Sequence, residues 1–193
     1  MAQRFAAAAL VSTAVLTAGL TGCHVRAGYD AASRVNGPLH TLMASSTTSH
    51  SDGVTNLPTT DGHNYTLEAG FGLKSISVNG LIAVHNVTSS SFTPGGGYLA
   101  TTFGLDVRWA MFDWHGLEPS LVGGPGRMML LDRNSGSTQW GNALRFGIGA
   151  QYKLGPVAVY ADLYREIVAF GDSSAAAGNT TLDGVTIGLA LQP

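Results

Sequence analysis

The sequence predicts an all-β protein folded as an eight-stranded antiparallel up-and-down transmembrane β-barrel, and three observations favour this fold. Apolar residues alternate with glycine or polar residues over most of the chain, with the period of two that is typical of β-strands. Most alternating segments have room for about ten residues or more, the length that a tilted strand needs to cross a bilayer. Long polar loops and very short turns alternate along the chain, so all the loops would lie at one end of the barrel.

The stretch 139–170 is the clearest hairpin. Its first arm carries apolar residues at alternate positions: Trp140, Leu144, Phe146, Ile148, Ala150 and Tyr152. A short turn, Leu154-Gly155-Pro156, follows. The second arm then resumes the alternation with Val157, Val159, Ala161 and Leu163. Two alternating segments joined by such a short turn indicate a pair of antiparallel strands.

Residues 1–22 have the pattern of an export signal. Arg4 supplies a positive start, and the apolar run 5–19 is too short to form a spanning helix. The run ends in Leu20-Thr21-Gly22-Cys23, which resembles the bacterial lipobox. That resemblance implies cleavage before Cys23, lipidation of Cys23 and a mature domain over 23–193. Because Cys23 is not followed by Asp, the resemblance favours the outer membrane, with the N-terminus periplasmic. An ordinary signal peptide followed by an incidental cysteine remains the alternative.

The rest of the chain supplies six further strands and the loops between them. We predict strands over 25–35, 65–74, 76–87, 98–110, 117–131 and 182–191. The long polar connections are 36–64, 88–97, 132–138 and 171–181. The strand number is even, and both ends of the mature chain fall at the end that carries the tight turns.

The segment 117–131 contains Gly123-Gly124-Pro125-Gly126, which interrupts its alternation. Pro125 cannot donate to a strand ladder, so this stretch predicts either a bulge or kink within one strand or a turn between two strands. A turn would leave strands of about six residues, which are too short to span a bilayer. We therefore favour one bent strand.

The composition is unusual for a soluble domain. Asp, Glu, Lys and Arg make up 11% of the chain, against about 25% in ordinary soluble domains. The net charge is −2 and the chain has no basic patch, so nucleic acid is not an expected partner.

The polar face of the predicted strands is small and rich in glycine: Gly28, Gly70, Gly72, Gly104, Gly147, Gly149 and Gly188. An eight-stranded barrel has an interior just wide enough for side chains, so we expect this face to point inward and the apolar face to meet lipid. A lipocalin-like soluble barrel would have the opposite arrangement. The two arrangements differ in where five apolar side chains point. A membrane barrel requires them to point outward and a soluble barrel requires them to point inward: Leu67, Phe71, Phe103, Phe146 and Ile148.

The same face carries six basic and six acidic residues. The basic ones are Arg26, Arg34, Lys74, Arg108, Arg145 and Lys153, and the acidic ones are Asp30, Glu68, Asp106, Glu118, Asp162 and Glu166. Buried charges must be paired, and equal numbers allow this. The turn at 155–156 brings Arg145 opposite Tyr164 or Glu166. We predict an internal polar network of Arg145, Glu166 and Asp162, together with a cross-strand or diagonal pair of Glu68 and His85.

The aromatic residues fall into two groups that would form belts at the two membrane interfaces. Trp109, Phe112, Trp114 and Tyr152 lie towards the tight turns, and Tyr65, Tyr98, Trp140 and Phe170 lie towards the loops. With these belts, the alternation and the closing strand 184–191, the mature chain resembles the small OmpA/OmpX-type outer-membrane barrels. The resemblance is architectural and implies no activity motif. Such barrels typically end in an aromatic residue, whereas this chain ends Leu191-Gln192-Pro193.

The sequence contains no strong catalytic or metal-binding motif. The histidines show no metal-ligand spacing, and a single cysteine allows no CxxC motif, so neither a metal nor another cofactor is expected. His50-Ser51-Asp52 has the residue types of a triad, but neighbours in a loop do not readily hold triad geometry.

Three functions remain as hypotheses. The first is a non-enzymatic outer-membrane barrel with a structural, surface-interaction or envelope role, whose loops 36–64, 88–97, 132–138 and 171–181 could meet an extracellular partner. The second is a lipid-anchored soluble barrel that binds an apolar ligand. The third is a lipid-modifying barrel enzyme, resembling the lipid A deacylases and palmitoyltransferases, which would need a Ser or Asp beside His85.

Overall fold

The computed structural model describes residues 22–36, 64–73, 75–87, 97–133, 135–171 and 178–192, without the side chains of 31–36, 73 and 178. Its strands are β1 (Cys23–Asn36), β2 (Tyr65–Leu73), β3 (Ile76–Val87), β4 (Tyr98–Ala110), β5 (Leu117–Asp132), β6 (Thr138–Leu154), β7 (Val157–Phe170) and β8 (Gly178–Leu191). The predicted signal 1–22, apart from Gly22, lies outside the described residues. So do His50-Ser51-Asp52 and most of the loops 36–64, 88–97 and 171–181.

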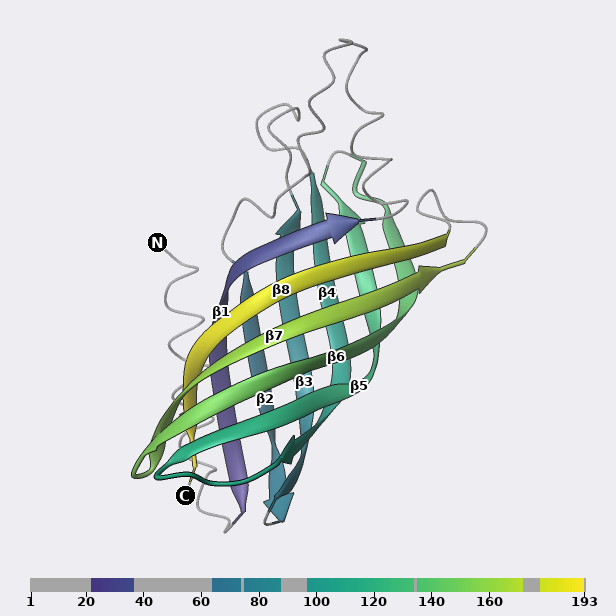
Figure 1. Cartoon of the computed structure of the whole chain (residues 1–193). Coiled ribbons are helices and arrows are strands. Elements are labelled where there is room, and N and C mark those ends of the chain that lie inside the picture. The colour runs from purple at the N-terminus through teal and green to yellow at the C-terminus, as the bar shows by residue number, and fades with distance from the viewer. Residues whose placement is uncertain are drawn as a thin grey trace.

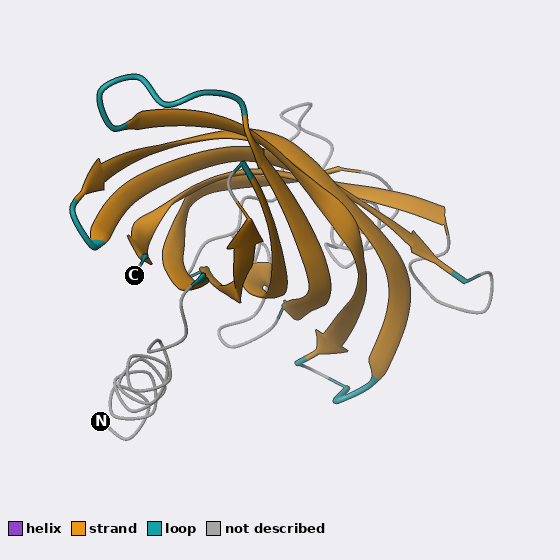
Figure 2. Ribbon diagram, turned by 90° about the horizontal axis from the view of Figure 1, so that it is seen from below, coloured by secondary structure: helices purple, strands orange, loops and turns teal. Residues whose placement is uncertain are grey.

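The eight strands form one closed antiparallel barrel, as the alternation predicts. Each strand pairs with the next along the chain, and β8 closes the ring by pairing with β1. Figure 1 places the tight connections β2–β3, β4–β5 and β6–β7 at the bottom, together with the C-terminal end of β8. We call this the turn end and the opposite side the loop end. Seen from the turn end, the strands curve around the barrel axis (Figure 2).

No helix in the described part of the chain is long and apolar enough to cross a membrane.

The hairpin 139–170 forms as β6 and β7 in the predicted register. Leu154 pairs with Val157 across the turn, where Gly155 has a φ of +77° that residues with a Cβ rarely adopt. Continuing along the ladder, Arg145 comes directly opposite Glu166. The turn chemistry therefore sets which side chains of these two strands share a face.

β8 begins earlier than predicted, at Gly178 instead of residue 182. Its first residues are polar, which favoured a loop in the sequence. In the barrel, Gly178 pairs with Phe170 and Thr180 pairs with Val168, so the end of β7 supplies a partner for this segment. Thr180 is buried, and pairing with a neighbouring strand overrides the local polar composition.

β5 is one continuous strand through Gly123–Gly126, so the prediction of a single strand is confirmed. Its ladder with β6 is unbroken, but its ladder with β4 lacks the pairs between Gly104↔Gly126 and Val107↔Gly123. The register is the same on both sides of this gap, so it contains no extra residue and is not a bulge. A Cβ on Gly124 would lie 1.7 Å from the carbonyl oxygen of Leu105, which explains the glycine at this position.

Alternation divides the side chains between an interior and an outer face. Along β7 every even-numbered residue from Ala158 to Phe170 is buried, whereas the odd-numbered residues are exposed or half-buried. Phe71, Phe103, Phe146 and Ile148 all point outward and are exposed, and Leu67 is half-buried. The charged residues Glu68, Asp106, Arg108, Arg145, Asp162 and Glu166 of β2, β4, β6 and β7 point inward and are buried, so the interior is polar, whereas Arg165 of β7 points outward.

Candidate functional site

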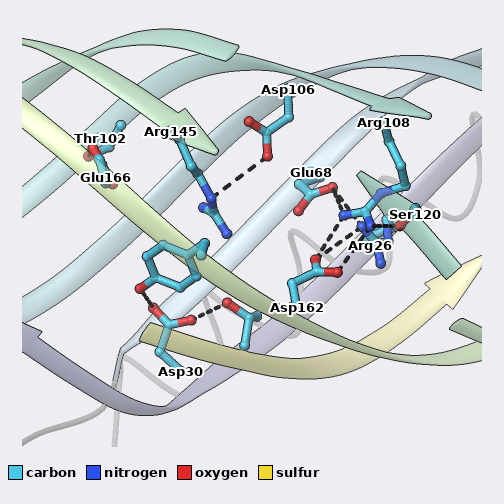
Figure 3. A network of polar contacts seen from close by, with 12 residues as sticks. Arg26, Asp30, Glu68, Thr102, Asp106, Arg108, Ser120, Arg145, Asp162 and Glu166 are labelled. Carbon is cyan, nitrogen blue, oxygen red and sulfur yellow. Dashed lines mark hydrogen bonds and ion pairs between the residues drawn. The ribbon is translucent and has the colours of Figure 1, made fainter. Parts of the chain in front are cut away.

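The barrel interior holds a buried polar network that is the first candidate site. The part nearer the turn end, which we call the lower part as in the orientation of Figure 1, centres on Arg108 of β4 and Asp162 of β7, which lie on the right of Figure 3. Arg108 donates from Nη1 and Nη2 to the two carboxylate oxygens of Asp162, at 3.0 and 2.8 Å. Arg108 also donates to Ser120 Oγ at 2.9 Å. This two-point contact fixes the guanidinium plane and joins three strands across the interior.

Arg26 of β1 completes this lower part. Its Nη1 atom lies 3.1 Å from Glu68 Oε2 and 3.4 Å from Asp162 Oδ2, and its guanidinium covers the Tyr160 ring at 3.7 Å from the ring centre. Two arginines and two carboxylates thus form one cluster, which we call the arginine cluster: Arg26, Glu68, Arg108 and Asp162.

The upper part of the network centres on Asp30 of β1. Tyr164 donates to Asp30 Oδ2 at 3.0 Å, the hydroxyl of Thr186 donates to Oδ1, and His85 Nδ1 lies 3.2 Å from Oδ2. Arg145 stacks on the Tyr164 ring at 4.1 Å and lies 3.9 Å from Asp106 Oδ2. Side chains from β1, β3, β4, β6, β7 and β8 therefore converge on the middle of the barrel.

The five predicted network residues, Arg145, Glu166, Asp162, Glu68 and His85, all lie in the interior, but their partners differ from the prediction. Glu68 pairs with Arg26, whereas His85 contacts Asp30. β2 and β3 pair Glu68 with Leu81, four residues before His85, so the predicted Glu68–His85 contact does not form. Only the register of β3 against its neighbours could have revealed this.

Arg145 faces Glu166 on the neighbouring strand, but its ion pair is with Asp106 on β4, across the interior. Asp162 pairs with Arg108 and Arg26 instead of Arg145. Glu166 accepts a hydrogen bond from Thr102 at 2.6 Å. Long side chains in a narrow barrel reach across the axis, so pairing along the ladder does not decide which charges meet.

Of the twelve charged residues predicted to line the interior, Lys74 and the side chain of Arg34 lie outside the described part of the structure, so the predicted balance of charge stays a prediction. Among the described interior residues, five carboxylates (Asp30, Glu68, Asp106, Asp162 and Glu166) face three guanidiniums (Arg26, Arg108 and Arg145). Hydroxyl groups and an imidazole stabilise the carboxylates that lack a close arginine, as at Asp30 and Glu166. Sequence reasoning placed Tyr164 near Arg145, as observed, but missed Thr102, Thr186 and the hydrogen bond from Tyr164 to Asp30.

An Asp–His pair is the arrangement that a hydrolase triad requires, and Asp30 with His85 has it. Both side chains are completely buried, and His85 Nε2 has no hydrogen-bond partner in the described part of the chain. A nucleophile would have to contact this Nε2 atom. Within the described residues the pair therefore has no third member of a triad, and its two side chains are buried inside the barrel.

An apolar cluster closes the interior towards the loop end. It consists of Ala100, Met128, Leu130, Ala143, Val168, Phe170 and Leu182, and all are buried. Phe170 was predicted to join the outer belt at this end, but it faces inward. Tyr98, which was also assigned to the belt, packs against this interior cluster.

The outer face is the second candidate site. The other predicted belt residues, Trp109, Phe112, Trp114, Tyr152, Tyr65 and Trp140, are all exposed on it. Trp140 packs near Phe103, with ring centres 6.5 Å apart, and lies under the guanidinium of Arg127 at 5.5 Å. Between the two groups the exposed side chains are large aliphatic and aromatic residues, such as Leu105, Leu144, Ile148, Leu163 and Ile187.

The β4–β5 turn carries a small polar motif at the turn end. Asp113 accepts a hydrogen bond from the Gly116 N–H at 2.9 Å and lies 3.1 Å from Lys153 Nζ. The hydrogen bond from the Gly116 N–H holds the pKa of the Asp113 carboxyl below its usual range, and the Lys153 ammonium lowers this pKa further by a smaller amount. Both groups favour the charged form of the carboxyl.

The described residues contain no group of three or more His, Cys, Asp or Glu side chains that could hold a metal ion.

Comparison with known proteins finds this fold but no close relative in sequence. No protein-family model matches the chain, and no curated protein matches it. Neisserial surface protein A (NspA) superposes with a TM-score of 0.66 at 11% identity, over 90% of this chain and 98% of that one. The fold is that of this small surface-protein barrel. The N-terminal β-barrel domain of Pseudomonas aeruginosa OprF matches with a TM-score of 0.51 at 11% identity, over 89% and 98% of the two chains.

Proposed function

We propose that the chain is a non-enzymatic barrel of the bacterial outer membrane, with a structural or surface-interaction role in the cell envelope. The observation that carries the proposal is the distribution of polarity: buried charges fill the interior and exposed aliphatic and aromatic side chains cover the outside. Soluble monomers rarely expose a continuous apolar surface of this kind. A bilayer provides the apolar surroundings that such a surface requires.

The height of the apolar surface matches the apolar band of an outer-membrane barrel. On β5, the outward-facing residues are uncharged from Leu117 up to Arg127, and on β7 from Val157 up to Arg165. These distances of about eight to ten residues correspond to about 20–25 Å along the barrel axis for strands tilted by about 40°. The apolar band of outer-membrane barrels is about 25 Å tall.

Lipidation of Cys23 is part of the proposal and rests on the lipobox resemblance. The register supports it, because Cys23 pairs with the exposed residue Phe71 at the start of β1. An acyl chain on Cys23 would then begin at the apolar outer face, at the turn end. Since both chain ends of the described barrel lie at this end, we place the turn end in the periplasm and the loop end outside the cell.

The other hypotheses have less support. A soluble barrel with an apolar ligand inside conflicts with an interior full of charged side chains. A lipid-modifying enzyme would need the Asp30–His85 pair to reach lipid, but this pair is enclosed by the barrel. We assign binding of an extracellular partner to four loops, because loops on a rigid scaffold commonly carry binding functions. These loops are 36–64, 88–97, 132–138 and 171–181.

Fractionation of bacterial membranes tests the proposal, with wild type and a Cys23→Ala variant. We expect both proteins to resist carbonate extraction and to migrate differently on gels before and after boiling, since the barrel itself would hold them in the membrane. Only the wild type should carry N-terminal acyl groups by mass spectrometry. A soluble Cys23→Ala variant would show that the barrel is merely tethered.

A charge on the outer face provides a second test. Ile148→Arg places a charge at an exposed position of β6 and should cost about 2–4 kcal/mol in a bilayer, since charged residues near the midplane of such barrels have this effect. Ser137→Arg, in the exposed connection before β6, is the matched control and should cost less than about 0.5 kcal/mol. Equal stability of the two variants in lipid vesicles would contradict a membrane-facing β6.

A further inference from the structure

Arg127 of β5 is a cation on the outer face of the barrel, towards the loop end. Its side chain is exposed and points outward at the edge of the apolar surface. The other outward-facing arginine of the strands whose side chain is described, Arg165, donates to Asp183 from Nε at 2.6 Å and from Nη2 at 2.8 Å. In the part of the chain that the structure describes, Arg127 has no carboxylate within ion-pair distance. Its charge is therefore available to a partner outside the chain.

Two aromatic rings flank Arg127. Phe103 of β4 pairs directly with Arg127, and Trp140 of β6 lies on the other side of β5, with the two ring centres 6.5 Å apart. The guanidinium carbon of Arg127 lies over the Trp140 ring, 5.5 Å from the ring centre. Such stacking uses the face of the guanidinium and leaves the N–H groups at its edge free to donate. The site is built by three consecutive strands, which lie side by side in Figure 1.

Asn142 of β6 places a second donor beside Arg127. The two residues pair directly across the β5–β6 ladder, and both side chains are exposed on the outer face. Residues opposite each other in a ladder have Cβ atoms about 4.5–5.5 Å apart, so the amide and the guanidinium can reach the same ligand. On the turn side of this pair the exposed residues Leu105 and Leu144 continue the apolar surface. The donors thus lie where the apolar surface ends.

We propose that Arg127 and Asn142 bind the phosphate group of a lipid in the leaflet at the loop end, with the Trp140 ring holding the guanidinium in place. A lipid has the matching arrangement, with an anionic phosphate at the level of the donors and acyl chains against the apolar surface. Guanidinium N–H groups fit phosphate oxygens in a two-point contact. The inference rests on the proposed function, because it requires a barrel that spans a bilayer.

Quenching of Trp140 fluorescence by brominated lipids tests the proposal. The chain has three tryptophans, so Trp109→Phe and Trp114→Phe, both at exposed positions, leave Trp140 as the reporter. The barrel is reconstituted in phosphatidylcholine vesicles with increasing fractions of brominated phosphatidic acid or brominated phosphatidylcholine, which differ only in the head group. We expect phosphatidic acid to bind beside Trp140 about threefold to tenfold more tightly than phosphatidylcholine, because its phosphate carries a net negative charge and no choline.

Two variants of this reporter barrel separate the site from the general charge of the surface. Arg127→Gln should abolish the preference for phosphatidic acid. Arg165→Gln, the matched control, removes the same charge but should keep the preference, since Arg165 already pairs with Asp183. An equal loss in both variants, or equal quenching by the two lipids before either substitution, would overturn the lipid site and leave the proposed function standing. No quenching by either lipid would overturn both, because Trp140 would then not face a bilayer.

Discussion

At the scale of single residues, the interior is organised by side chains that reach across the barrel axis. Arg108 contacts Asp162 from a strand that is not its neighbour, and Tyr164 reaches Asp30 in the same way. Small residues make room for these contacts, since a Cβ on Gly149 would lie 2.0 Å from Asp162 Oδ1. The stability of the barrel should therefore depend on a few buried polar groups.

Arg108→Met should destabilise the barrel strongly. The variant loses both contacts to Asp162 and leaves this buried carboxylate with Arg26 alone. Removing one partner of a buried ion pair typically costs about 3–5 kcal/mol. Urea unfolding in lipid vesicles, followed by tryptophan fluorescence, measures the change. Arg133→Met, in the exposed connection after β5, should stay within about 0.5 kcal/mol of the wild type, and an equal loss in both variants would contradict the network.

Asp113 should make stability depend on pH at the turn end. The Gly116 N–H and Lys153 lower the pKa of Asp113 in the folded barrel. The ionised Asp113 carboxyl therefore makes its full contribution to the free energy of unfolding above the unfolded pKa of about 3.9. The contribution is lost as the pH falls through the folded pKa. The difference in unfolding free energy between wild type and Asp113→Asn should therefore be constant from about pH 5 to 7 and shrink below about pH 4. A difference that grows in acid would contradict this assignment.

At the scale of the elements, β5 shows how a strand with poor local propensity is held in place. Pro125 and its three neighbouring glycines disfavour a regular strand, yet β6 pairs with every residue of this stretch. The β4 ladder opens at the same level, where Leu105 and Asp106 face Gly124 and Pro125 without pairing. The close approach of the Leu105 carbonyl to Gly124 leaves no space for a side chain there.

Gly124→Ala should consequently weaken the β4–β5 contact. The new methyl group would overlap the Leu105 carbonyl oxygen, which belongs to the backbone and cannot rotate away. Overpacking of this kind costs about 1–3 kcal/mol, measured by the midpoint of urea unfolding. Gly171→Ala is the control, because nothing lies within 4 Å of its added Cβ. If both variants unfolded at the same urea concentration, the close approach at Gly124 would be wrong.

At the scale of the whole molecule, the interior is polar in its lower and middle parts and apolar towards the loop end. The arginine cluster, the Asp30 group and the apolar cluster follow one another along the axis, and together they fill the barrel. A pocket of about 270 Å³, lined by residues that include Arg26, Arg108 and Lys153, opens at the turn end of this interior. Its contents would exchange with the solution on the turn side.

A filled interior predicts that the barrel does not conduct ions. Purified protein in planar bilayers should give no steady open-channel current at moderate voltage, because the buried side chains of Met128, Leu130 and Phe170 pack together in the interior towards the loop end. A porin with a water-filled channel, reconstituted in the same way, serves as the positive control. Reproducible unitary currents from the wild type would contradict the closed interior.

The sequence by itself determined the strand number and the division between inner and outer faces, and it narrowed the register of the β6–β7 hairpin to two alternatives, one of which forms. These features follow from a period of two and from turn length, which act between residues close in the chain. It also identified the five interior network residues by type and face.

Only the tertiary structure decided the partners. Asp106 for Arg145, Asp30 for His85 and the inward direction of Phe170 depend on contacts between strands that are not consecutive in the chain. The early start of β8 depends on the end of β7, which supplies a partner for residues 178–181. In a closed barrel, the shear between strands and the narrow interior set which side chains meet across the axis, and no local pattern encodes these contacts.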